Sequence, residues 1–107
     1  LWKTNGSDVG TEMVKDIYSG SFSSSPNFLV SYNGLLYFGA NDGSSGFELW
    51  KSDGTDAGTV MVEDINVGGD SYPVYMTVSG GNLYFNANDG MSGQELWKHD
   101  GTNTVMV

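Results

Sequence analysis

Short apolar segments alternate with turn residues along the whole chain. In its middle the segments are Phe28–Tyr32, Leu35–Ala40, Phe47–Lys51 and Val60–Ile65. They are rich in Val, Leu, Tyr, Phe and Trp, which suits β-strands, and no window has the spacing of an amphipathic helix. Asn33-Gly34 predicts a hairpin turn, because a type I′ turn needs positive φ at both central residues. We therefore expect an all-β, antiparallel fold.

The segments recur at a fixed period. The stretch ELWKSDGT at residues 48–55 returns as ELWKHDGT at residues 95–102, and LWKTNGS stands at residues 1–7. Leu49 lies 48 residues after Leu1, and Leu96 lies 47 residues after Leu49. A period in this range is typical of propellers and solenoids. Residues 1–107 therefore form a tandem array, with repeat 1 at 1–48, repeat 2 at 49–95 and a partial repeat 3 at 96–107.

Four antiparallel strands in each repeat predict the blade of a β-propeller. Phe28–Tyr32 is expected to be the innermost strand, followed by Leu35–Ala40 and Phe47–Lys51, with Val60–Ile65 the outermost. Leu35–Ala40 is apolar on both faces, as expected for a strand that is covered on both sides. The chain then contains ten strands, about two and a half blades. We expect it to be part of a longer array, or to complete a ring with other copies.

The charge argues against several function classes. Four Lys and no Arg stand against 13 Asp and Glu, for a net charge of −9. Without a basic patch, binding to nucleic acid or to anionic membranes is not expected. The sequence contains no run of 18 apolar residues, so membrane insertion is not expected. The chain has no cysteine, so disulfides and thiolate chemistry are excluded.

The tryptophans offer two interpretations. Trp2, Trp50 and Trp97 occupy the same position in each repeat. They could fill the space between blades, or form a platform on which sugars stack. Because they lie within repeated apolar segments, we favour the core interpretation. His99 is the single histidine and has no second His or Cys to complete a zinc site, so we expect an exposed turn residue.

Acidic turns are the candidate sites. Asp42 and Asp89 lie in repeated ANDG turns, and Asp53 and Asp100 lie in repeated DGT turns. Such turns offer the oxygen ligands that Ca²⁺ prefers, so Asp42 and Asp89 are the candidate calcium ligands. The alternative is that these side chains bond their own turns. Asp53 and Asp100 are the candidate binding residues if the repeats recognise sugars. No other cofactor is expected.

An enzyme is not expected. The nucleophile elbow, P-loop, dinucleotide fingerprint and zinc-protease motifs are all lacking. Glu63 and Asp64 are adjacent carboxylates, but neighbouring residues of a strand point to opposite faces. They therefore cannot act on one substrate from two sides, as a glycosidase requires.

The succession of ELWKSDGT, AGT, VMVEDI, LYF and ANDG resembles the ELWxxDGT repeat of bacterial and archaeal extracellular proteins. The resemblance covers essentially the whole chain, with Asn5 in place of the motif's Asp in the first copy. It implies β-propeller-like repeats in a large secreted or surface protein. We expect a non-catalytic module with a structural or adhesive role, whose partners are other copies or further repeats. The alternative is a lectin-like propeller that binds glycans at one site per blade.

Overall fold

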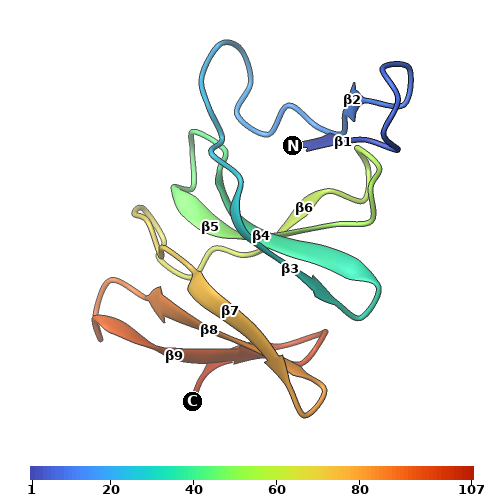
Figure 1. Ribbon diagram of the computed structural model, residues 1–107. Coiled ribbons are helices and arrows are strands. Elements are labelled where there is room, and N and C mark those ends of the chain that lie inside the picture. The colour runs from blue at the N-terminus through green and yellow to red at the C-terminus, as the bar shows by residue number, and fades with distance from the viewer.

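The computed structural model describes residues 1–107 as ten β-strands in three antiparallel sheets, with no helix (Figure 1). The strands are β1 (Trp2–Lys3), β2 (Glu12–Met13), β3 (Asn27–Tyr32), β4 (Leu35–Asn41), β5 (Phe47–Ser52), β6 (Val60–Glu63), β7 (Val74–Ser79), β8 (Asn82–Asn88), β9 (Gln94–His99) and β10 (Thr104–Met106). The all-β prediction and the number of strands are confirmed. No helix has the length and apolar character needed to cross a membrane.

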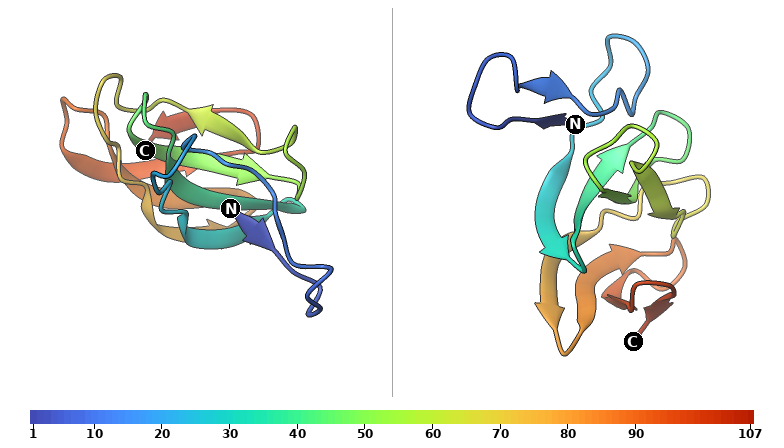
Figure 2. Two further views of the ribbon diagram at one scale, coloured as in Figure 1. Left: turned by 90° about the horizontal axis from the view of Figure 1, so that it is seen from above. Right: turned by 90° about the vertical axis from the view of Figure 1, so that its right-hand side faces the viewer.

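Each four-stranded sheet combines strands of two successive repeats: β3 and β4 lie within residues 1–48, whereas most of β5 and all of β6 lie within residues 49–95. Strands β1 and β2 make a two-stranded sheet, β3-β4-β5-β6 make the first four-stranded sheet, and β7-β8-β9-β10 make the second. Neighbours in sequence are neighbours in space, as predicted, because short turns join antiparallel strands. The three sheets follow one another across the molecule (Figure 2). They close neither a barrel nor a complete propeller.

The hairpin turns have the predicted backbone. Between β3 and β4, Asn33 and Gly34 have φ values of 51° and 76°. Between β7 and β8, Gly80 and Gly81 have φ values of 55° and 80°. Positive φ at both central residues twists the turn in the same sense as the flanking strands. The Asn-Gly signal in the sequence therefore located the hairpin correctly.

The two interfaces between sheets hold the core. At the second interface, between the two four-stranded sheets, the buried residues are Tyr32, Tyr37, Leu49, Leu83, Phe85 and Ala87. At the first interface, between the two-stranded sheet and the first four-stranded sheet, they are Ile17, Phe38, Ala40 and Trp50, with Leu1, Leu36 and Met61 packed against them. Neighbouring residues of β4 thus face opposite interfaces. This explains why Leu35–Ala40 is apolar throughout.

The three tryptophans differ in burial. Trp50 is only 7% exposed, as the core interpretation predicts, whereas Trp2 is 65% exposed. Trp97 is half-buried and packs into the second interface. Leu1 faces the first interface, so the adjacent Trp2 points to the opposite side of its strand, where no sheet packs. Trp2 is thus exposed on the side that, for the equivalent Trp50, packs against the preceding sheet.

Candidate functional site

Asp53 is held by its own turn between β5 and β6. Its Oδ1 accepts hydrogen bonds from the backbone N–H of Thr55 at 2.9 Å and from the Thr55 hydroxyl at 2.7 Å. These bonds hold the pKa of the exposed carboxyl below its ordinary value. A Cβ added at Gly58 would collide with the Asp53 carboxylate and displace it from its turn partners. The repeated DGT signal is explained by turn geometry.

The other two copies use the same arrangement. Asn5 Oδ1 accepts from the backbone N–H and the hydroxyl of Ser7, at 3.1 and 2.7 Å. Asp100 Oδ1 accepts from the N–H groups of Thr102 and Asn103, at 2.9 and 2.7 Å, and these bonds lower its pKa. Asn can replace Asp because an acceptor oxygen, not a charge, completes the turn. Asp53 and Asp100 belong to separate sheets and form no common site.

Asp42 and Asp89 also bond their own turns. Asp42 Oδ1 accepts from the N–H groups of Ser44 and Ser45 at 2.8 and 2.7 Å, and Oδ2 accepts from the Ser45 hydroxyl at 3.1 Å. Asp89 makes the same three bonds in its own turn. Burial acts to raise the pKa of Asp42, but these hydrogen bonds together bring it below the ordinary value. No group of three or more His, Cys, Asp or Glu is placed to hold a metal ion.

Calcium is expected to leave the stability of the chain unchanged. The Asp42 carboxylate is occupied by donors of its own turn, and it belongs to no group of three or more side chains that could hold a metal ion. We expect the same thermal midpoint in excess Ca²⁺ and in chelator. Asp42→Ala should lower that midpoint equally in both, because it removes only turn hydrogen bonds. A calcium-dependent rise that Asp42→Ala abolishes would instead establish Asp42 as a ligand.

His99 is a buried strand residue, so the prediction of an exposed turn was wrong. It ends β9 and is 1% exposed. Its Nδ1 lies 3.0 Å from the Thr104 hydroxyl, and its Nε2 lies 3.3 Å from the Tyr37 hydroxyl across the second interface. At the equivalent position the Ser52 hydroxyl lies 2.7 Å from that of Thr59. The imidazole therefore takes the place of a hydroxyl in a repeated contact between neighbouring strands.

The burial of His99 predicts a loss of stability in acid. Burial lowers its pKa below the ordinary value of 6.5, and Lys51 adds to this effect. The unfolded chain then takes up the proton first, so the free energy of unfolding should fall as the pH drops through 6.5 toward the folded-state pKa. His99→Ser, with the side chain of the equivalent Ser52, should weaken this dependence. Urea denaturation at pH values of about 7.5 and 5.5 measures how far the free energy of unfolding falls with pH. An equal fall in the wild type and in His99→Ser would exclude this role.

Glu48 is a buried carboxylate that the sequence analysis did not single out. It is fully buried, and its two oxygens accept from the backbone N–H groups of Ile65 at 2.9 Å and Ser71 at 3.0 Å. Burial raises its pKa, and the hydrogen bonds oppose that shift in part. Ile65 and Ser71 lie in the connection between β6 and β7. Glu48 therefore fixes the segment that joins the two four-stranded sheets.

A signal for this role was present in the sequence. Glu48 and Glu95 occupy the same position of the repeat, each inside an otherwise apolar segment. Charged side chains are rarely buried without partners, so a carboxylate repeated in an apolar strand indicates a specific acceptor. Glu95 itself is exposed, because no further sheet follows β10 in this structure.

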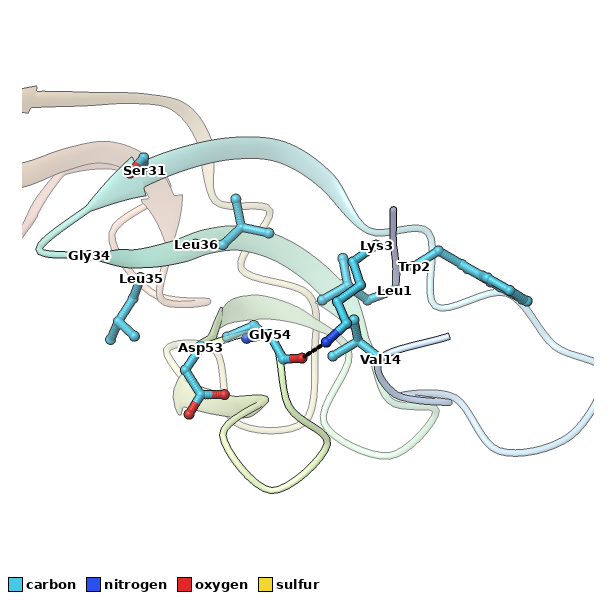
Figure 3. A pocket seen from close by; sticks show the side chains of 11 residues that line it. Leu1, Trp2, Lys3, Val14, Ser31, Gly34, Leu35, Leu36, Asp53 and Gly54 are labelled. Carbon is cyan, nitrogen blue, oxygen red and sulfur yellow. Dashed lines mark hydrogen bonds between the residues drawn. The ribbon is translucent and has the colours of Figure 1, made fainter. Parts of the chain in front are cut away.

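A hollow of about 300 Å³, here called the β1 hollow, lies at the first interface (Figure 3). Its lining residues are Leu1, Trp2, Lys3, Val14, Ser31, Gly34, Leu35, Leu36, Ser52, Asp53 and Gly54. Lys3 Nζ donates to the carbonyl of Gly54 at 2.9 Å across it. The Trp2 indole extends away from the other labelled side chains (Figure 3). Of the predicted site residues, only Asp53 reaches this hollow.

The tryptophans do not form a sugar platform. Trp50 is buried at the first interface, Trp97 is half-buried at the second, and Trp2 is exposed on a separate sheet. The three tryptophan rings therefore do not form the row of exposed aromatic rings that would favour a lectin. The glycan alternative stays a prediction that these observations do not support.

Comparison with family models, with curated proteins and with solved structures finds no match for the chain.

Proposed function

We propose that this chain is a non-catalytic repeat module of an extracellular or surface protein, in which each four-stranded sheet is a propeller blade. Its role is structural or adhesive, exerted by packing on further repeats of the same kind. The proposal agrees with the resemblance to ELWxxDGT repeats. The acidic charge of −9 is compatible with solubility outside the cell.

One observation carries the proposal. The first four-stranded sheet contributes side chains to the second interface. The equivalent side chains of the second four-stranded sheet are uncovered. Leu49 is fully buried, whereas the equivalent Leu96 is 46% exposed. Glu48 is buried and bonds the next connection, whereas the equivalent Glu95 is exposed and makes no such bond. An open apolar surface of this kind marks a protein-interaction site.

The second interface shows what can cover that surface. There, Leu49 and Tyr37 pack against Leu83 and Phe85 of the following sheet. Leu96 and Tyr84 present the corresponding positions to whatever follows the second sheet. A further repeat carries the complementary side chains, because Leu83 and Phe85 belong to the repeat themselves. Another copy of the repeat is therefore the partner whose chemistry fits.

Self-association tests the proposal. We expect light scattering after gel filtration to give a mass above the 11.5 kDa of one chain, increasing with concentration. Leu96→Glu places a charge in the open apolar surface and should return the protein to a monomer. Met91→Glu, at an exposed turn position, adds the same charge elsewhere and should leave association unchanged. A monomer at all concentrations would overturn the proposal.

A further inference from the structure

The β1 hollow can be compared position by position with a filled part of the molecule. The repeat equates Gly34, Ser52 and Gly54 of the hollow with Gly81, His99 and Gly101 of the second sheet. The three residues of the hollow line an open space. Their three counterparts in the second sheet face the inner strands of the preceding sheet. The second interface therefore shows which side chains fill the space equivalent to the hollow when two complete sheets meet.

Two tyrosines occupy the equivalent position at the second interface. The Tyr32 hydroxyl donates to the carbonyl of Gly81 at 2.8 Å. The Tyr37 hydroxyl lies 3.3 Å from His99 Nε2. A Cβ added at Gly101 would lie 3.2 Å from Asn33 Nδ2 and 3.8 Å from the Tyr32 hydroxyl, so this glycine also lies beside the same turn. All three counterparts of the hollow's residues thus face side chains of one β-hairpin, two of which are tyrosines.

That hairpin consists of β3 and β4. The two-stranded sheet of β1 and β2 contains no equivalent hairpin. Strand β5 pairs with β4 on one edge and with β6 on the other. Strand β1, which corresponds to β5, pairs only with β2. One edge of β1 therefore carries backbone donors and acceptors that another strand can bond. The open edge and the hollow lie together, because Lys3 of β1 is part of the hollow's lining.

We propose that the β1 hollow is a docking site for a β-hairpin of this same repeat, supplied by another copy, which adds to the edge of β1 and inserts two tyrosine rings. Strand addition to an open edge supplies backbone hydrogen bonds, and side-chain pockets supply specificity. This inference rests on the proposed function, since it identifies which element of another repeat is bound. It concerns a different surface from Leu96.

The lining of the hollow suits these rings. Leu1, Val14 and Leu36 provide apolar walls, while the Ser52 hydroxyl and the Gly34 carbonyl stand where His99 and the Gly81 carbonyl contact the tyrosines. A buried tyrosine needs a partner of this kind for its hydroxyl.

The register of the second strand can also be inferred. Tyr37 lies opposite Lys51 in the pairing of β4 with β5. Lys51 corresponds to Lys3, so the second incoming tyrosine should lie opposite Lys3. Lys3 now donates to Gly54, whereas Lys51 makes no such bond to the equivalent Gly101. We therefore expect the incoming hairpin to displace the Lys3 contact.

The test uses the full chain and a synthetic peptide with the sequence of residues 26–41, which contains Tyr32, Asn33-Gly34 and Tyr37. We expect saturable binding in fluorescence anisotropy with a labelled peptide. A peptide with both tyrosines replaced by alanine should bind about tenfold more weakly or worse, because it loses two rings and their hydroxyl bonds. Equal binding of the two peptides would overturn the proposal, as would the lack of saturable binding.

Variants of the protein locate the binding. Ser31→Trp fills the rim of the hollow and should abolish peptide binding, whereas Ser79→Trp, an exposed serine on β7, should leave it unchanged. Circular dichroism confirms that both variants fold. Peptide binding that Ser31→Trp does not weaken, or that a glycan displaces, would overturn the assignment. Association through Leu96 without peptide binding would do so too, while leaving the proposed function standing.

Discussion

Replacing Trp50 by alanine is expected to lower the free energy of unfolding by about 3–5 kcal/mol, the usual cost of deleting a large core aromatic. Trp50 packs with Ile17, Phe38 and Ala40 at the first interface, and only 7% of it is exposed. The deletion leaves a cavity that two β-sheets cannot readily close. Urea denaturation followed by circular dichroism at neutral pH measures the loss.

The matched control is Trp2→Ala. Trp2 occupies the same position of the repeat but is exposed, so its removal should change stability by no more than about 0.5 kcal/mol. Trp97, which is half-buried, should give a loss between the two. Equal effects at Trp2 and Trp50 would contradict the packing of the first interface.

Replacing Glu48 by alanine is expected to cost about 1–3 kcal/mol, because one backbone N–H loses its acceptor and a second keeps only the Phe47 carbonyl at 3.1 Å. These are the backbone groups of Ile65 and Ser71, which stand 2.9 and 3.0 Å from the carboxylate oxygens. Water cannot replace the carboxylate without opening the interface, since Glu48 is fully buried. The same denaturation experiment measures the effect.

Glu95→Ala is the control, because it removes the same side chain at an exposed position. It should change stability by less than about 0.5 kcal/mol when the protein is monomeric. Glu48→Gln keeps one acceptor oxygen and avoids the burial of a charge, so we expect it to cost less than Glu48→Ala. A stability of Glu48→Ala equal to that of the wild type would show that the two N–H groups find other partners.

The strand order could be predicted because local signals agreed with one another. The Asn33-Gly34 turn, the short apolar segments and the period of 47 or 48 residues all indicated the same sheet. Turn chemistry was also among the predicted alternatives for Asp42 and Asp53, since Asx side chains bond nearby N–H groups wherever a turn requires it. What these local signals cannot give is the contact between one sheet and the next.

The errors and omissions all lie at those contacts. His99 was interpreted from its place beside a turn, but its imidazole replaces the hydroxyl of Ser52 and reaches Tyr37 of another sheet. Glu48 was overlooked because a carboxylate is expected in solvent, and its partners lie in the following connection. The β1 hollow likewise has walls from two repeats. Each of these features depends on packing between residues that are distant in sequence.

The opposite orientations of neighbouring residues on β4 bear on how such a protein can lengthen. Tyr37 faces the second interface and Phe38 faces the first, so a single repeat carries both halves of a complementary pair of surfaces. A tandem duplication of the coding segment therefore supplies a new unit and its matching neighbour surface in one step. The number of units can grow without any new interface having to evolve, and divergence such as Ser79 in place of Tyr32 can follow afterwards.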